Sequence, residues 1–201
     1  MSQEVRPARR ADVAALAHTL ARAFHHDPVF CWLQPDAARR AAALPVFFAT
    51  MARHHFLSGG GLELATAGAG VGAAAMWDPP GRWMLSPREQ LTTAPALIRV
   101  FRGRLGAARA LGEEMKANHP EEPHWYLAMI GSDPRVRGSG CGAALMRSRL
   151  DRCDAEGAPA YLESSNPDNL PYYLRFGFEV TGEITVPGGA PPMWCMWRQP
   201  R

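Results

Sequence analysis

The chain has 201 residues, of which 47% are hydrophobic and 20% charged, and its formal net charge is +3. This length suits one folded domain with a substantial core, and the composition is ordinary for a globular protein. Lys116 is the single lysine, so arginines carry nearly all the positive charge, and no basic run exceeds two residues. Such diffuse charge gives no reason to expect a nucleic-acid partner.

Targeting, membrane and metal signals are also weak. MSQEVRPARR lacks the apolar centre of a signal peptide, and no apolar run approaches the roughly 18 residues of a membrane span. We therefore expect no membrane partner. The four cysteines form no CxxC pair, which predicts reduced thiols in a cytoplasmic protein. The adjacent histidines at 25–26 and 54–55 point about 100° apart on a helix, so we expect no metal.

Hydrophobic periodicity predicts the first elements of the chain. EVRPA is a short strand, and ADVAALAHTLARAF is a helix with Val13, Leu16 and Leu20 on one face. This helix should end before Asp27-Pro28, since the residue before a proline avoids the α region. HHDPVFCWLQPD is then expected to be a loop. A second helix spans roughly 36–57 and ends at SGGG.

The remaining chain alternates strands and helices. LELATA and VGAAAMWDPP form a hairpin, 86–116 is helical with breaks, and WYLAMIGS at 125–132 is a buried strand. A helix from Ser139 to about Glu156, the strand PAYLES, the short helix NLPYYLRF and the strands GFEVTGEITV and MWCMWRQ follow. This order predicts one α/β (α+β) domain over 1–201, with a mixed sheet of about seven strands and helices on both faces.

A glycine-rich segment, RVRGSGCGAAL at 135–145, precedes one predicted helix. Such turns at helix N-termini bind phosphate groups. A nucleoside-triphosphate loop needs GxxxxGK[ST], and no lysine lies nearby. A dinucleotide fingerprint fits formally, with Glu163 as the ribose acid, but DPRVR separates the glycines from the strand and too little chain follows for a second half. A turn that only caps the helix remains an alternative, although three alternating glycines exceed what one cap needs.

The third reading is the [QR]xxGxG pattern of acyl-CoA-binding N-acetyltransferases, here Arg137-Gly138-Ser139-Gly140-Cys141-Gly142. With Y-x-x-x-G-F at 173–178, the chain resembles the GCN5-related N-acetyltransferases (GNAT) over nearly its full length. EPHWYLAMIGSDPRVRGSGCG, GAPAYLESSNPDNLPYYLRFGFEVT and MWCMWRQP resemble the puromycin N-acetyltransferase subgroup in particular. The resemblance implies the GNAT fold with splayed central strands, an N-acetyltransferase enzyme, acetyl-CoA as cosubstrate, no metal, and a link to antibiotic resistance.

The same resemblance implies a set of coenzyme contacts. The backbone at 130–132 would pair with the pantetheine arm like an added strand, and the amides of the glycine-rich loop would bind the diphosphate. The expected set is Ile130, Gly131, Ser132, Arg137, Gly138, Ser139, Gly140, Cys141, Gly142 and Asn169.

Acetyl transfer needs a neutral amine, a stabilised oxyanion and a proton for the departing thiolate. Glu163 ends the strand AYLE and is the expected general base, acting through a water; an ion-pairing or capping glutamate is the alternative. The resemblance makes the Tyr173 hydroxyl the general acid and Tyr172 an aromatic core residue, with packing alone as the alternative for Tyr173. A backbone N–H near Gly131 or Ser132 is expected to stabilise the oxyanion.

The acceptor pocket is expected opposite the coenzyme, between HHDPVFCWLQPD and VPGGAPPM. Its expected lining residues are Phe24, Asp27, Phe30, Trp32 and Trp77, although any of the aromatic ones could equally be core. Six tryptophans and few nearby acids favour a small-molecule amine, puromycin-like or another antibiotic or metabolite. A protein or peptide N-acetyltransferase and a non-catalytic acyl-CoA-binding regulatory module remain alternatives. The chain is expected to be a monomer or a homodimer.

Overall fold

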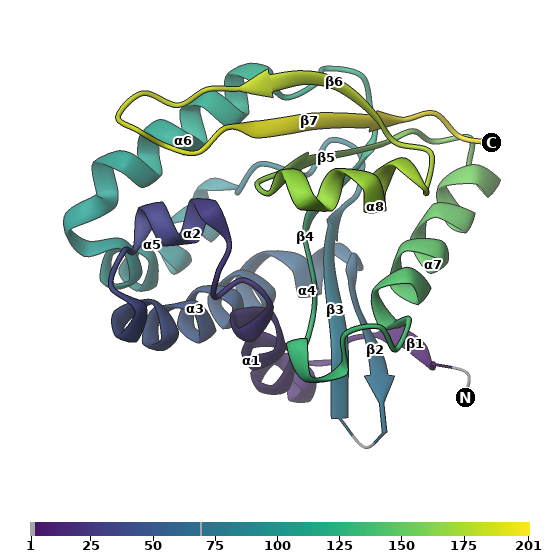
Figure 1. Ribbon diagram of the computed structural model, residues 1–201, viewed down its shortest axis with the longest axis horizontal. Helices are drawn as coiled ribbons and strands as arrows, with labels where there is room; N and C mark the ends of the chain where they lie inside the picture. The colour runs from purple at the N-terminus through teal and green to yellow at the C-terminus, as the bar shows by residue number, and fades with distance from the viewer. Residues whose placement is uncertain (1–2, 69) are drawn as a thin grey trace.

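The computed structural model describes residues 3–68 and 70–201. Within them, one mixed sheet has the strand order β1-β2-β3-β4-β5-β7-β6. Its strands are β1 Val5–Pro7, β2 Leu62–Ala67, β3 Gly70–Asp78, β4 Trp125–Ser132, β5 Ala160–Ser164, β6 Glu179–Ile184 and β7 Met193–Arg198. The helices are α1 Val13–Ala23, α2 Pro28–Leu33, α3 Ala37–Met51, α4 Leu57–Gly59, α5 Pro87–Phe101, α6 Leu105–Asn118, α7 Cys141–Ala155 and α8 Leu170–Leu174. The predicted mixed sheet with helices on both faces is confirmed (Figure 1).

Strand β3 shows how the sequence divides the core between the two faces of the sheet. Successive side chains of a strand point to opposite faces. Ala73, Ala75 and Trp77 belong to the apolar cluster that contains residues of α7. Ala74 and Met76 belong to the cluster formed with α1 and α3. These five side chains are fully buried, so β3 is a central strand covered on both faces.

The two central parallel strands separate part-way along their length. Strand β4 pairs with β5 only over Trp125–Leu127 and Ala160–Leu162. Strand β4 then continues to Ser132 along β3, whereas the end of β5 stays paired with β7. A register shift in the β3–β4 pairing also leaves Ala128 as an extra residue, and such bulges increase local twist. The expected splay of the central strands is confirmed, and it opens a gap between β4 and β5.

One predicted loop contains a helix. Asp27 precedes α2 and its Oδ1 accepts a hydrogen bond from the Phe30 backbone N–H at 3.0 Å, while Pro28 occupies the first turn. An Asp cap followed by proline is a helix start, so the loop prediction for HHDPVFCWLQPD is wrong over Pro28–Leu33. The helix predicted over 36–57 is confirmed as α3 and a π-helical turn at Ala52–Phe56, with Gly60 at φ 70° after the last turn. In the described part of the chain, none of the helices has the length and apolar character needed to cross a membrane.

Candidate active site

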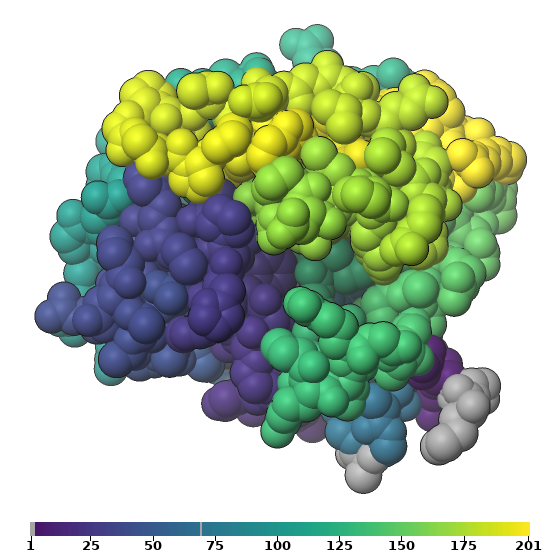
Figure 2. Space-filling model, viewed as in Figure 1, coloured from purple at the N-terminus to yellow at the C-terminus, as the bar shows by residue number. Residues whose placement is uncertain are grey.

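A cavity of about 520 Å³ lies at the gap between the central strands. The end of β4, the loop before α7, the first turns of α7, helix α8 and the α1–α2 connection form its walls. Figure 2 shows the hollow between the purple early chain, the green loop and yellow-green α8. Every residue of the expected coenzyme-binding set lines it: Ile130, Gly131, Ser132, Arg137, Gly138, Ser139, Gly140, Cys141, Gly142 and Asn169.

The glycine-rich loop has a backbone shape that only glycine adopts easily. Gly138 and Gly140 have φ of 85° and 87°, in the left-handed region that disfavours a Cβ. Gly140 caps α7, and the first helical hydrogen bond runs from the Ala144 N–H to the Gly140 oxygen. The N–H groups at 141–143 therefore have no acceptor within the helix, and these residues line the cavity. A helix N-terminus of this kind favours a phosphate group.

Close packing explains two further glycines. A Cβ on Gly131 would lie 2.7 Å from the Ala23 Cβ, so glycine lets β4 approach α1. A Cβ on Gly142 would lie 3.0 Å from the Ser132 Oγ and 3.3 Å from the Tyr172 hydroxyl. Gly131 therefore allows the close packing of β4 on α1, and Gly142 leaves room for the Ser132 and Tyr172 side chains at the cavity wall.

Asp133 fixes the loop to the rest of the fold. Its buried carboxylate accepts hydrogen bonds from Arg135 Nη2 at 2.7 Å and from Arg22 Nη2 of α1 at 2.7 Å. Hydrogen bonds from Arg135, together with those from Arg22, hold the pKa of Asp133 well below its ordinary value. This ion-pair cluster connects the end of β4, helix α1 and the glycine-rich loop before α7.

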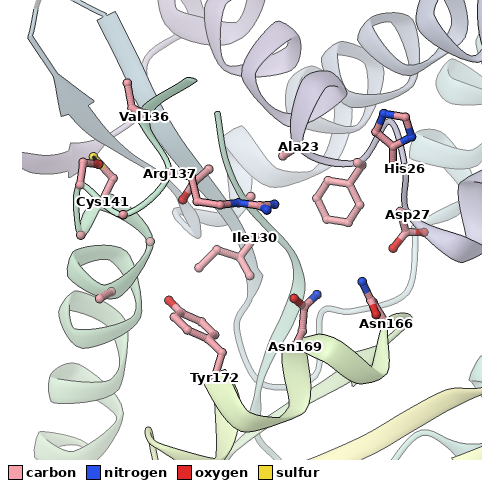
Figure 3. Close-up of a pocket in the computed structure, with 18 of the residues that line it drawn as sticks. Ala23, His26, Asp27, Ile130, Val136, Arg137, Cys141, Asn166, Asn169 and Tyr172 are labelled. Atoms are coloured by element: carbon pink, nitrogen blue, oxygen red, sulfur yellow. Dashed lines mark hydrogen bonds between the residues drawn. The ribbon is translucent and has the colours of Figure 1, made fainter. Parts of the chain in front are cut away.

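One face of α8 and the turn before it lines the cavity. Asn166, Asn169, Tyr172 and Arg175 are spaced by three, so they share a helical face, and all four line the cavity. Figure 3 shows Asn166 directed toward Asp27, Asn169 toward Arg137, and the Tyr172 hydroxyl toward the start of α7. Arg175 is outside the coenzyme set predicted from the sequence, although the three-residue spacing in NPDNLPYYLR indicates that it shares this helical face.

The same geometry places the two tyrosines differently from the expectation. Tyr172, expected in the core, packs against the core cluster as a partly buried residue and also lines the cavity. Burial raises the pKa of Tyr172 to about 12, and its hydroxyl has no hydrogen-bond partner among residues 3–68 and 70–201. Tyr173 is 8% exposed, packs in the core with Phe178 and lines neither this cavity nor the next one. Burial, then Tyr172 and Asp27, raise the pKa of Tyr173, so it stays protonated at neutral pH. Its role as an acid stays a prediction.

A second cavity of about 260 Å³ lies beyond the first. Its lining is largely apolar and comes from α2, α3, α5, α6, β4 and β7. Its acidic lining residues are Asp27 and Glu163. Phe24, Asp27 and Ile130 line both cavities, so the two spaces meet at these residues.

The structure divides the expected acceptor residues into two groups. Phe24, Asp27 and Phe30 line the second cavity. Trp77 does not, because it points to the α7 face of β3 and is fully buried there. Trp32 does not line it either, because its ring lies under the Arg104 guanidinium at 5.0 Å and its Nε1 donates to the Gly188 oxygen. The predictions for Trp32 and Trp77 are therefore wrong.

The two carboxylates of the second cavity have different surroundings. Asp27 accepts hydrogen bonds from the Phe30 N–H and, at Oδ2, from the Ser165 hydroxyl. Burial raises the pKa of Asp27, and these hydrogen bonds reduce the shift. The Glu163 side chain is 1% exposed, and neither of its oxygens has a hydrogen-bond partner among residues 3–68 and 70–201. Glu163 is thus a buried carboxylate beside the cavity. Burial raises the pKa values of the Tyr126 and Tyr161 phenols, and both are close enough for the charge of Glu163 to raise them further.

Comparisons with known proteins agree with this architecture. Residues 77–178 match the model of the acetyltransferase (GNAT) family. An uncharacterised N-acetyltransferase of Schizosaccharomyces pombe is 35% identical over 82 residues, which cover 40% of this chain and 33% of that relative. The match thus spans about a third of the relative's length.

Solved structures are similar over nearly the full length. A Corynebacterium glutamicum protein described as a histone acetyltransferase and related acetyltransferase has a TM-score of 0.78 and 28% identity, covering 100% of this chain and 98% of that chain. A Drosophila melanogaster polyamine N-acetyltransferase that forms N-acetylagmatine has a TM-score of 0.64 and 15% identity, covering 98% and 100%. Because the family model matches about half of the sequence, the chain belongs to the acetyltransferase (GNAT) family.

Proposed function

We propose that this protein transfers the acetyl group of acetyl-CoA to the primary amine of a small, largely apolar molecule, of the puromycin type or another antibiotic or metabolite amine. The observation that carries the proposal is the meeting of two cavities at Phe24, Asp27 and Ile130. The glycine-rich loop lines one cavity, and Glu163 lines the other.

The first cavity has the groups that coenzyme A requires. Acetyl-CoA would supply the activated acetyl group. The N–H groups at the start of α7, with Arg137 and Arg175 in the same wall, suit the negative charge of a diphosphate. Beyond Leu127, β4 has no partner on its β5 side among the described strands, so its backbone is open to an extended chain such as the pantetheine arm.

Glu163 is the proposed base that makes the amine a nucleophile. An alkylamine is an ammonium ion at neutral pH and cannot attack until it loses a proton. Glu163 takes that proton, directly or through one water, and the neutral nitrogen forms the new amide bond as the bond to sulfur breaks. Tyr173 is the proposed donor of a proton to the departing sulfur. Its side chain lines neither cavity, but it is close enough to Asp27, where the cavities meet, for the charge of Asp27 to add to the effect of burial and Tyr172 on its raised pKa.

The second cavity favours the class of acceptor. Aromatic and aliphatic side chains such as Phe30, Phe47, Phe101 and Met193 line most of it, which suits an apolar body rather than a basic peptide tail. Its two carboxylates would face the ammonium group. A small amine with an aromatic or aliphatic body is therefore the favoured acceptor over a peptide.

Thiol release from acetyl-CoA tests the proposal, with puromycin, agmatine, a lysine peptide and a peptide with a free N-terminus as acceptors. We expect puromycin or other aryl-bearing amines to give the highest kcat/KM. Release with the peptides alone would contradict the small-molecule proposal. Tight binding of acetyl-CoA, with no release of its thiol in the presence of any acceptor, would indicate a binding module instead of an enzyme.

A further inference from the structure

Two histidines lie in a row between Glu163 and a separate surface cavity. The Nδ1 of His119 lies 3.7 Å from the Glu163 Oε1, and the two side chains are 2% and 1% exposed. The Nε2 of His119 lies 3.1 Å from the Nε2 of His124. His124 lines a separate surface cavity of about 230 Å³. The carboxylate and the two imidazoles thus form a continuous row.

Packing holds the His119 ring in this row. Trp83 stacks on it with ring centroids 3.8 Å apart and an interplanar angle of 22°. The rings of Tyr126 and Tyr161 meet it edge-on at 4.9 Å and 5.2 Å. These contacts fix the plane of the ring, and the contact of its Nε2 with His124 Nε2 leaves Nδ1 toward Glu163.

The hydrogen bonds determine which nitrogen of each ring has the proton. The Nδ1 of His124 lies 2.6 Å from the Glu122 carbonyl oxygen, so it must donate. A neutral His124 then has a lone pair at Nε2 and accepts the proton of His119 Nε2. A neutral His119 consequently has a lone pair at Nδ1, facing Glu163. The 3.7 Å separation exceeds the usual N–H···O range of about 2.7–3.2 Å, as this arrangement requires.

We propose that His119 accepts, from Glu163, the proton that the acceptor amine loses, and that His124 holds His119 in the tautomer able to accept it. This inference rests on the proposed function. An ammonium acceptor gives up two protons during acetylation: one ends on the coenzyme thiol and the other must leave the buried site. Glu163 takes the second proton and passes it to His119 Nδ1, which restores the carboxylate. The resulting imidazolium donates from Nε2 to His124, and its extra proton passes to water when the product leaves.

The charged and titratable groups around the pair are consistent with this role. Burial, then the charge of Glu163, raise the pKa values of Tyr126 and Tyr161, so both phenols stay neutral at the working pH. Burial also lowers the pKa of His124, and the neighbouring His119 adds to that shift. His124 therefore stays neutral and serves as the hydrogen-bond acceptor that positions His119.

The test compares His119→Gln and His124→Gln with Trp83→Phe, a packing control that touches the His119 ring but does not titrate. The readout is kcat/KM against pH, with the best acceptor from the panel. At pH 7, where an alkylamine binds as an ammonium ion, we expect His119→Gln to be about 10–100-fold slower. Above the pKa of the amine, the acceptor arrives neutral, and the deficit should shrink to about threefold or less.

The positioning role of His124 predicts the same pH-dependent deficit in His124→Gln, but smaller, and a pH-independent effect in Trp83→Phe. A deficit in His119→Gln that stays constant across pH would overturn the inference, because loss of packing alone has that signature. Full activity of His119→Gln at pH 7 would also overturn it. A wild-type protein inactive toward every amine would instead overturn the proposed function, and the inference with it.

Discussion

Asp27 and Glu163 share one cavity, yet their neighbours give them different roles. Asp27 is committed to the Phe30 N–H and the Ser165 hydroxyl, whereas the Glu163 oxygens have no hydrogen-bond partner in the described ranges. Environments that separate two carboxyl groups in this way separate their chemistry. Asp27 is therefore suited to orienting the acceptor and joining α2 to the end of β5, and Glu163 is suited to moving a proton.

Replacing Glu163 should impair the chemical step selectively. Glu163→Gln keeps the size of the side chain but cannot accept the amine proton, so we expect kcat to fall by ~10²–10⁴. The Kd for acetyl-CoA should change little, because Glu163 lines the second cavity and not the first. Steady-state kinetics and calorimetry measure the two effects. Unchanged kcat would remove Glu163 from the mechanism.

The neighbouring tyrosines allow a matched pair of variants. Tyr172→Phe removes a hydroxyl beside the start of α7 and should raise the Kd for acetyl-CoA about 2–10-fold. Tyr173→Phe removes the proposed acid and should lower kcat with little change in that Kd. The reverse pattern, with kcat lost only in Tyr172→Phe, would assign the acid to Tyr172 and contradict the role given to Tyr173.

At the scale of elements, the N-terminus of α7 is the proposed coenzyme site, and the glycines at the two ends of α7 allow an effect on binding to be distinguished from an effect on stability. Gly140 before α7 and Gly157 after it both have positive φ, 87° and 62°. An alanine at either position costs ~1–2 kcal/mol of backbone strain. Gly140 lines the first cavity, where the coenzyme is proposed to bind, and Gly157 does not.

We therefore expect Gly140→Ala and Gly157→Ala to lower the free energy of unfolding by similar amounts. Only Gly140→Ala should weaken acetyl-CoA binding, by about tenfold, which corresponds to ~1.4 kcal/mol. Urea unfolding and calorimetry measure the two quantities. Equal acetyl-CoA affinity in both variants would show that the loop conformation does not determine binding.

The Asp133 cluster, which connects α1 to this loop, predicts a dependence of stability on pH. A carboxyl whose pKa is lowered by folding stabilises the fold above its ordinary pKa, here 3.8, and that contribution is lost as pH falls through the lowered value. Asp133→Asn should cost ~1–3 kcal/mol at pH 7. The difference from wild type should be constant down to about pH 4 and shrink below it. Asp151→Asn, at an exposed position of α7, is the control; a difference that stays the same between pH 4 and pH 2 would contradict the ion-pair explanation.

At the scale of the whole molecule, the sequence predicted what depends on local pattern. Most of the strand and helix order, the mixed sheet with helices on both faces and the loop–α7 junction follow from periodicity, glycine positions and the spacing of [QR]xxGxG. The side chains that line each cavity were harder to predict, because a shift of one residue along a strand or a helix moves a side chain to a different face of that element. Tyr172 and Tyr173 are adjacent on α8, yet only Tyr172 lines the first cavity. The alternation of side chains along β3 directs Trp77 to the α7 face of the sheet, away from the acceptor cavity.

Features that depend on distant segments could not be predicted from the sequence. His119 and Glu163 belong to segments far apart in the sequence, yet the His119 Nδ1 lies 3.7 Å from the Glu163 Oε1. The wall of the second cavity likewise combines α2, α5, α6 and β7. No local pattern in these segments indicates a shared site.

A crystal structure with bound coenzyme A tests the central claim most directly. We expect the diphosphate against the backbone of residues 137–142, the pantetheine arm along β4 at 130–132, and the thiol where the two cavities meet, beside Asp27 and Ile130. A coenzyme bound with its diphosphate away from the start of α7, or with its thiol directed away from the cavity that contains Glu163, would contradict the proposed site and both catalytic assignments.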